Sequence, residues 1–113
     1  MAALDCIFCQ IIRDKIPSEI VFRDKKFIVF KDIHPKAEIH FLIVPVRHIE
    51  SVDVLKKTDK ALAGEMILLA QALAKKFKIQ GRYKLVFNVG RGGGQLVEHI
   101  HLHLLSGWPR VGK

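Results

Sequence analysis

Apolar residues fall in short runs in the first half of the chain and again near its end, and these runs predict β-strands. Each run is rich in Ile, Val, Phe or Leu and is bounded by charged or turn-forming residues, as strands usually are. The charged stretch between the first two runs favours a hairpin. The expected strands span Glu19–Phe22, Phe27–Phe30, Ile39–Val46, Arg82–Val89 and Glu98–Leu105.

Two other segments predict helices. The longer one covers Lys60–Lys78, where Ala, Leu, Met and Lys dominate. A shorter one covers Ile7–Arg13 and ends before Pro17, which cannot continue a helix, and one helical turn is expected around His48–Val52. Five strands with a long helix between the third and the fourth predict a single α+β domain over residues 1–113, built on a mainly antiparallel sheet.

The long helix is apolar around most of its circumference. Its expected core-facing stripe consists of Leu62, Met66, Leu69, Leu73 and Phe77. Further small or apolar residues widen that stripe, namely Ala63, Ile67, Ala70 and Ala74. A helix of this kind must be covered on more than one side, and in so small a domain a second subunit is the expected cover. We therefore expect a homodimer that joins this helix and the fourth strand of two copies.

The composition is that of a globular protein of the cytoplasm. At 113 residues, half of them apolar, the chain suits one hydrophobic core. No apolar run approaches the roughly 20 residues of a membrane-spanning helix, and the first residues lack the pattern of a signal peptide. We expect a cytoplasmic protein with no membrane partner.

The net charge of +8 favours polyanionic partners, which include both nucleic acids and small phosphate esters. The basic residues are scattered and are not interleaved with aromatic residues on one face. A nucleic-acid partner is therefore not required, and a solvated basic surface explains much of the charge.

Three histidines alternate with large aliphatic residues near the end of the chain. In a strand, His99, His101 and His103 would share one face, while the aliphatic residues between them would enter the core on the other. The pattern by itself fits a metal site made of all three, phosphoryl chemistry at an imidazole, or an exposed strand with no function. Just upstream, the run Gly92-Gly93-Gly94-Gln95 brings backbone N–H groups near these histidines, and such a turn can bind phosphate oxygens.

The segment His99–Leu105 reads H-x-H-x-H-x-x with aliphatic residues at x, and so resembles the signature of the histidine triad (HIT) family. The nucleotide-binding, Hint-like branch is similar in further blocks, in the same order from about Asp5 to Gly107. Those blocks are Ile7-Phe8 with Ile11-Ile12-Arg13 and Ile16-Pro17, Phe30-Lys31-Asp32-Ile33-His34-Pro35, His40-Phe41-Leu42-Ile43-Val44-Pro45, Asn88 with Gly90, and Gly93-Gly94-Gln95.

The resemblance implies a HIT-like fold and a nucleophilic role for His101, which would form a nucleotidyl-histidine intermediate on an α-phosphate. His99 and His103 complete the implied catalytic set. The other implied contacts to the phosphate, ribose and base are Asp32, Ile33, His34, Asn88, Gly94 and Gln95. His40 matches a histidine at the edge of the family's site, although a histidine that is merely paired at the start of a strand would look the same.

Two departures from the family pattern affect the expected specificity. Leu96 stands where a polar residue that can touch the phosphate is common, and Glu98 stands where an aromatic residue is common. The tail beyond Trp108 is short, and the family's tail helps to choose the leaving group. The leaving group therefore does not follow from the resemblance.

Cys6 and Cys9 form a C-x-x-C pair in a chain without a secretory signal, which disfavours a structural disulfide. Bacterial members of the family resemble this arrangement, and their pattern implies a structural zinc ion on Cys6, Cys9, His48 and His99. Two small buried thiols that pack the first helix are the alternative.

The principal hypothesis is an enzyme that releases AMP from adenosine phosphoramidates or acyl-adenylates. A dinucleoside-polyphosphate hydrolase or nucleotidyl transferase of the same superfamily is the enzymatic alternative. A regulatory module that binds nucleotides or associates with RNA, without needing turnover, is an alternative of another class.

Overall fold

The computed structural model describes residues 6–107, so the tail beyond Trp108 lies outside the described residues. It contains one five-stranded sheet in the order β1-β2-β3-β5-β4, and every pairing is antiparallel. This confirms the predicted α+β class and the number of strands. The strands are β1 (Ile20–Arg23), β2 (Phe27–Lys31), β3 (Ile39–Pro45), β4 (Lys84–Val86) and β5 (Leu102–Ser106).

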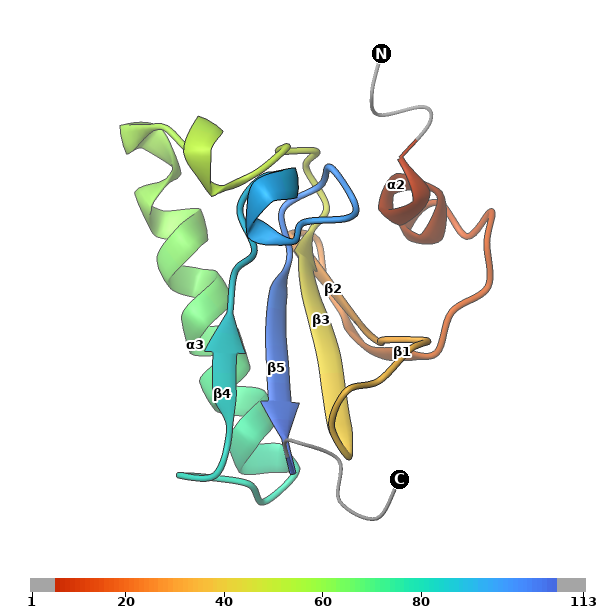
Figure 1. The fold of residues 1–113 in the computed structure, drawn as a ribbon, viewed down its shortest axis with the longest axis vertical. Helices are drawn as coiled ribbons and strands as arrows, with labels where there is room; N and C mark the ends of the chain where they lie inside the picture. The colour runs from red at the N-terminus through yellow and green to blue at the C-terminus, as the bar shows by residue number, and fades with distance from the viewer. Residues whose placement is uncertain (1–5, 108–113) are drawn as a thin grey trace.

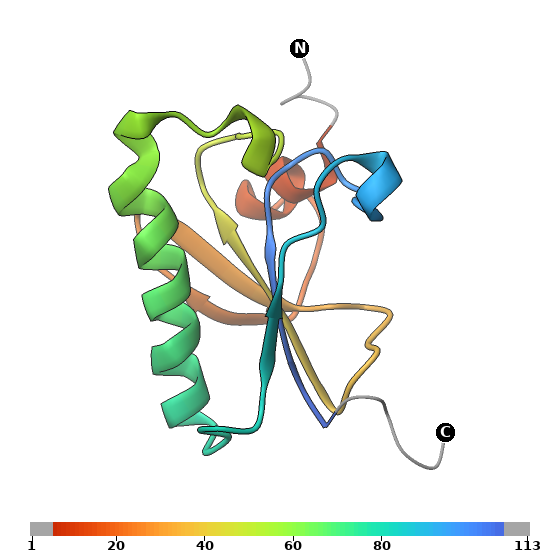
Figure 2. The same cartoon turned by 60° about the vertical axis from the view of Figure 1, so that its left-hand side comes forward.

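Two α-helices lie on different sides of this sheet (Figures 1 and 2). The short helix α2 covers Ile7–Ile12, and the long helix α3 covers Lys60–Lys76. Three 3-10 turns complete the described secondary structure: Val52–Val54, Lys57–Asp59 and Arg91–Gly93. The helical turn expected at His48–Val52 was wrong in position, because the chain first turns at Val52, where the Ser51 hydroxyl accepts the N–H of Asp53 at 3.2 Å.

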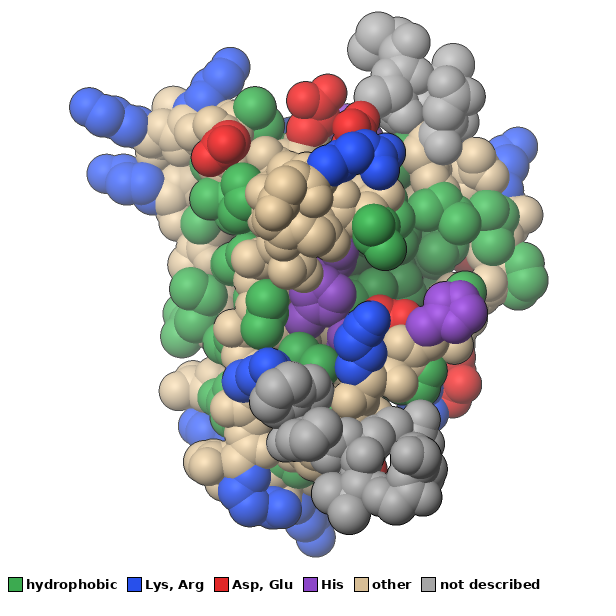
Figure 3. All heavy atoms as spheres, viewed as in Figure 1, with side chains coloured by type: hydrophobic (Ala, Val, Ile, Leu, Met, Phe, Trp, Pro, Cys, Tyr) green, Lys and Arg blue, Asp and Glu red, His purple; other side chains and the backbone are tan. Residues whose placement is uncertain are grey.

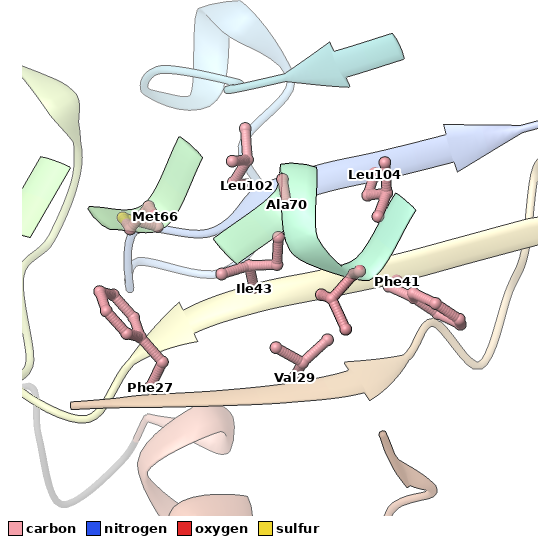
Figure 4. Packing of buried hydrophobic residues seen from close by; sticks show 9 residues of the cluster. Phe27, Val29, Phe41, Ile43, Met66, Ala70, Leu102 and Leu104 are labelled. Carbon is pink, nitrogen blue, oxygen red and sulfur yellow. The ribbon is translucent and has the colours of Figure 1, made fainter. Parts of the chain in front are cut away.

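The alternation of side chains divides the core into two layers. Phe27, Val29, Phe41 and Ile43 form one core cluster with Met66 of α3 (Figure 4). Their neighbours along the same strands face the opposite way and pack around α2, and these are Ile28, Phe30, Leu42 and Val44. β2 and β3 are therefore buried on both faces, which explains why their sequences are apolar at almost every position.

The last two strands are shorter than expected. β4 has three residues, and β5 begins at Leu102 rather than at Glu98. Just before β5 the backbone forms its hydrogen bond outside the sheet, because the N–H of Ile100 donates to the carbonyl of Ile49 at 2.6 Å. His99 and His101 thus lie in the approach to the strand. Leu102 and Leu104 still enter the α3 layer, as predicted, so that His103 between them faces the other side.

The buried face of α3 differs from the expected stripe. Its buried residues are Met66, Ala70, Leu73 and Ala74, so two alanines take positions that we had placed outside the stripe. Small side chains there let the helix axis approach the sheet closely. Ile67 and Leu68 remain 49% and 61% exposed, which leaves an apolar strip on the outer side of the helix. No helix in the described part of the chain is long and apolar enough to cross a membrane.

Candidate active site

A pocket of about 550 Å³ opens on the side of the sheet away from α3, between α2 and the loops that follow β2 and β4. His101 and His103 line it. Six other predicted substrate contacts also line it: Asp32, Ile33, His34, His40, Asn88 and Gly94. Figure 3 shows histidine side chains in a hollow of the molecule, with hydrophobic side chains on one side of them and basic side chains nearby. The pocket thus brings together segments from both ends of the chain.

His101 is 8% exposed and is held in one orientation. Its Nδ1 lies 2.7 Å from the carbonyl oxygen of His99, and since a carbonyl can only accept, Nδ1 carries the proton. The lone pair of the neutral ring is therefore on Nε2. The ring of Phe8 meets the imidazole edge to face with centroids 5.0 Å apart. Burial lowers the pKa of His101, so the ring is neutral near pH 7.

A second chain of contacts orients His103. The backbone N–H of Lys36 donates to Nδ1 of His40 at 3.1 Å, which places the proton of a neutral His40 on Nε2. That Nε2 lies 2.9 Å from Nδ1 of His103 and 3.4 Å from a carboxylate oxygen of Asp32. His103 accordingly accepts at Nδ1 and keeps its own proton on Nε2. His40 is thus both a paired strand residue and a direct neighbour of the triad.

Burial keeps the inner histidines uncharged. It lowers the pKa of His103 to about 4, and the nearby His101 and His40 rings add to the effect. It also lowers the pKa of His40, against the opposing influence of the Asp32 carboxylate. At neutral pH the site therefore offers one imidazole with a free Nε2 lone pair beside another with an Nε2–H donor.

The glycine-rich loop differs from what the sequence led us to expect. The N–H groups of Gly93, Gly94 and Gln95 each donate at 3.0 Å to a carbonyl of Gly90 or Arg91, so they are not free for a phosphate. Gly94 itself lines the pocket in the left-handed region, with φ of +88°, a conformation that favours glycine.

The Gln95 side chain is buried and lies away from the pocket lining. Its Nε2 donates to the carbonyls of Glu50 and Val97 at 2.7 and 2.9 Å, while its Oε1 accepts the N–H of Gly90 at 2.9 Å. Asn88 lines the pocket and donates to the carbonyl of Gly93 at 3.0 Å. Gln95 and Asn88 therefore hold the shape of the loop.

The predicted metal ligands Cys6, Cys9, His48 and His99 come together behind the pocket. Their Sγ and Nδ1 atoms all lie within 4.8 Å of one another. Nδ1 of His99 lies 3.3 Å from Sγ of Cys6 and 3.2 Å from Nδ1 of His48. Ligand atoms around a tetrahedral zinc ion, with bonds of ~2.0–2.3 Å, lie roughly 3.3–3.8 Å apart. The spacing therefore fits such an ion.

The protonation of these groups also fits a cation. The Nε2–H of His99 donates to the carbonyl of Pro45 at 2.8 Å, so its Nδ1 lone pair faces the thiols. Burial lowers the pKa of His99 to about 4, which keeps the ring neutral. Burial and the adjacent Cys6 raise the pKa of the Cys9 thiol to about 11, because two thiolates repel each other unless a cation lies between them.

The triad does not form one metal site among the described residues. His99 belongs to the cysteine cluster, while His103 belongs to a separate group with Asp32 and His40. Sequence reasoning did not assign a role to Phe8 or Lys36. Phe8 lies in a block that resembles the family, so its ring could have been considered, whereas Lys36 acts through its backbone and leaves no sequence signal.

Comparisons with known proteins identify the family of the chain. The family model described as "Scavenger mRNA decapping enzyme C-term binding" matches residues 5–108. An uncharacterised HIT-like protein of Buchnera aphidicola is 42% identical over 102 residues, which cover 89% of this chain and 91% of that one. Protein HitA of Neisseria gonorrhoeae is 37% identical over 90% of this chain and 95% of its own.

Solved structures share the whole fold. A HIT family hydrolase from Legionella pneumophila superposes with a TM-score of 0.88 at 43% identity, covering 92% of this chain and 97% of that one. A histidine triad nucleotide-binding protein from Candida albicans superposes with a TM-score of 0.78 at 34% identity, covering 88% of this chain and 72% of that one. These matches confirm the HIT-like fold that the resemblance implied, and the chain belongs to the histidine triad family.

Proposed function

We propose that this chain is a nucleotide phosphoramidase or hydrolase that releases AMP, or another purine nucleoside monophosphate, from phosphoramidates or acyl-adenylates. The observation that carries the proposal is the hydrogen bond from Nδ1 of His101 to the carbonyl of His99. It leaves the lone pair of the neutral ring on Nε2, at the wall of the pocket. A neutral, oriented imidazole is a competent nucleophile near pH 7. The hydrolase and the nucleotide-binding protein among the similar structures support the same class of activity.

The nucleoside would occupy the half of the pocket next to α2. Its walls are apolar, with Ile7, Phe8 and Ile11 from the helix and Phe30 from β2. Such walls suit the flat faces of a purine. Asp32 also lines the pocket, and its carboxylate oxygens would accept hydrogen bonds from ribose hydroxyl groups.

The reaction would proceed in two displacements at the α-phosphorus. Nε2 of His101 bonds to phosphorus, and the P–N bond to the leaving amine breaks. The amine nitrogen keeps the bonding electron pair and takes up a proton that arrives from solvent through His103. Water then attacks phosphorus, the bond to His101 breaks with its electron pair returning to Nε2, and the displaced proton leaves by the same route. AMP and a free amine are the products.

The residues around His101 would act mainly by positioning, which is most of what phosphoryl transfer asks of a protein. His103 would offer its Nε2–H to a phosphate oxygen or to the leaving group, because its Nδ1 accepts from His40. Asn88 and Gly94 would hold the loop beside the α-phosphate. An acyl-adenylate would react in the same way, with a P–O bond in place of the P–N bond.

The cysteine cluster would hold a structural zinc ion. Cys6, Cys9, His48 and His99 supply four protein ligands, so no open coordination position remains for substrate. When bound, zinc would neutralise the two thiolates and fix the ring of His99. The cluster would then affect catalysis through the backbone of His99, because the His99 carbonyl accepts the hydrogen bond that orients the His101 ring.

The protein would act as a homodimer in the cytoplasm. Ile67 and Leu68 leave an exposed apolar strip on α3, and β4 is the edge strand of the sheet on that side. A dimer interface formed by α3 and β4 of two copies would bury the apolar strip and would cover the edge strand.

Incubation with adenosine 5′-phosphoramidate, with AMP release as the measurement, separates the hypotheses. Release of AMP supports the proposed enzyme. Cleavage of diadenosine polyphosphates alone would favour the polyphosphate hydrolase, and tight nucleotide binding without turnover would favour a regulatory module.

The first prediction concerns the nucleophile. His101→Ala should lower kcat for AMP release by at least about 1000-fold, because it removes the atom that attacks phosphorus. AMP binding, measured by calorimetry, should change much less, since the apolar walls remain. Mass spectrometry of parent protein quenched in alkaline denaturant should find an adenylyl group on His101, because the P–N bond to an imidazole is acid-labile. Turnover by the variant at a rate comparable to the parent would refute the assignment.

The second prediction concerns pH and stability. The folded-state pKa of His103 is about 4 and its unfolded value is about 6.5, so between these pH values the unfolded state binds a proton that the folded state does not. The free energy of unfolding should therefore fall as the pH drops from about 6.5 to 4. Urea unfolding should show a smaller fall for His103→Gln than for the parent. His34→Gln, which removes an exposed histidine, is the control, and equal slopes for all three proteins would contradict the expectation.

The third prediction concerns the metal. Protein purified without a histidine tag under reducing conditions should contain about one zinc per chain by elemental analysis, and Cys6→Ser should lose it. His40→Asn should retain it, because His40 belongs to the other group of potential ligands. Chelation should lower the melting temperature of the parent. No zinc after reconstitution would assign the thiols to core packing.

The fourth prediction concerns assembly. Light scattering at micromolar concentration should report about twice the chain mass of 12.9 kDa. Leu68→Glu should give a folded monomer, because the substitution would bury a carboxylate in the dimer interface. Val54→Glu makes the same change at another exposed apolar residue and should leave the dimer intact. A monomeric parent protein would disprove this part of the proposal.

A further inference from the structure

Leu96 is an exposed apolar residue in the lining of the pocket that contains His101. Its side chain is 79% exposed, and among the large hydrophobic residues of the described chain only Ile33, at 80%, is exposed to a similar extent. His101 in the same lining is buried. The pocket therefore extends from a buried histidine to an opening at which Leu96 meets solvent.

The residues on either side of Leu96 are fixed in place. The side-chain amide of Gln95 donates to the carbonyls of Glu50 and Val97 at 2.7 and 2.9 Å. Val97 packs against the core cluster around α2, and its carbonyl also accepts the N–H of His99 at 2.9 Å. The backbone of Leu96 is thus held between two anchored neighbours, which keeps its side chain at the pocket and out of the core.

The loop before Leu96 has already used most of its hydrogen-bond donors. The N–H groups of Gly93, Gly94 and Gln95 donate to carbonyls of the same loop, and both donors of the Gln95 amide are engaged as well. A polar group placed against this stretch and against Leu96 would lose water without gaining an equivalent partner. An apolar group there would instead bury its own surface and that of Leu96.

The direction of the proposed reaction brings the leaving group toward this opening. Phosphoryl transfer sets the attacking and leaving atoms roughly in line on opposite sides of phosphorus. The attacking Nε2 belongs to the buried ring of His101, so the leaving group points away from the buried wall. The walls proposed for the nucleoside include Phe8, Ile11 and Phe30, which are buried, whereas Leu96 is not. Leu96 therefore suits the part of the substrate that leaves.

We propose that Leu96 selects substrates whose leaving group is apolar close to the scissile P–N or P–O bond, such as an alkyl or aryl amine or an acyl group with a large apolar side chain. This inference rests on the proposed function and names its substrate class. Leu96 is a specificity-determining residue and takes no part in bond breaking. An apolar leaving group covers its exposed side chain, and a polar group of the same size gains less from that contact.

Two adenosine phosphoramidates of equal size test the inference. Their amines are 3-methylbutylamine and β-alaninamide, which have the same number of heavy atoms and are both uncharged at the far end, but end in an isopropyl group and a carboxamide. kcat/KM of the parent should be about tenfold higher for the 3-methylbutylamine compound. The ratio should not shrink as salt is added, because an apolar contact is not screened.

Substitutions of Leu96 locate the preference. The two amines differ in basicity, so the decisive measurement is the change of the kcat/KM ratio between proteins. Leu96→Asn, which puts a carboxamide of similar size at the opening, should lower the ratio of the apolar over the polar compound by about fivefold. Leu96→Met keeps an apolar side chain and should retain most of the ratio. An undiminished ratio in Leu96→Asn would overturn the inference.

Val54→Asn is the matched control. It replaces another exposed apolar residue, outside the pocket lining, and its kcat/KM ratio should equal that of the parent. Leu96→Asn should keep the melting temperature of the parent, because the side chain of Leu96 makes no part of the core.

Contact between Leu96 and the nucleoside would give a different result. AMP has no leaving group, so its affinity, measured by calorimetry, should fall by less than about twofold in Leu96→Asn. An equal loss of kcat/KM for both compounds, together with weaker AMP binding, would place Leu96 beside the nucleoside and overturn the inference. A ratio that falls in Ile33→Asn but not in Leu96→Asn would assign the selection to Ile33 and overturn it as well.

The proposed function can fail separately. If the parent protein releases no AMP from unsubstituted adenosine phosphoramidate, the phosphoramidase assignment fails. The dissociation constants of the two compounds then still measure the selection: the parent should bind the 3-methylbutylamine compound more tightly, and Leu96→Asn should narrow the difference. Equal dissociation constants in the parent, or the same difference in both proteins, would overturn the role of Leu96.

Discussion

The hydrogen bond between Nδ1 of His101 and the carbonyl of His99 decides which nitrogen of the buried imidazole can react. It spans only two residues, yet its geometry depends on distant segments. The His99 ring donates to Pro45 at the end of β3 and faces the thiols at the start of α2. The N–H of Ile100 donates to Ile49 in the loop after β3, which fixes the backbone on the other side of the His99 carbonyl. The orientation of the His101 ring therefore depends on three other parts of the chain: the start of α2, the end of β3 and the loop that follows β3.

The two faces of the sheet have different roles. Along β5, Leu102 and Leu104 pack beneath α3, while His103 between them faces the pocket. β3 behaves in the same way, since Phe41 joins the α3 layer and His40 reaches His103. The pocket floor is therefore the back of a well-packed layer. Preorganisation of this kind is what phosphoryl transfer needs most from a protein.

Electrostatic roles in the pocket are also divided. Burial lowers the pKa of His101 and His103, so both imidazole rings are neutral near pH 7. The positively charged side chains of the pocket lining are those of Lys31, Lys36 and Lys84.

Much of this architecture followed from the sequence alone. The strict alternation of His99 to Leu104 determined which residues enter the core, the apolar runs determined five strands and two helices, and the C-x-x-C pair identified two of the four residues in the cysteine and histidine cluster. Local patterns suffice there, because side-chain alternation and helix periodicity are properties of a few neighbouring residues. Only the tertiary structure decided that β5 starts at Leu102, that the Gly93 to Gln95 amides are engaged within their own loop, and that Lys36 orients His40. Those features depend on which distant segment reaches a backbone group first, and no local pattern in the sequence encodes that contact.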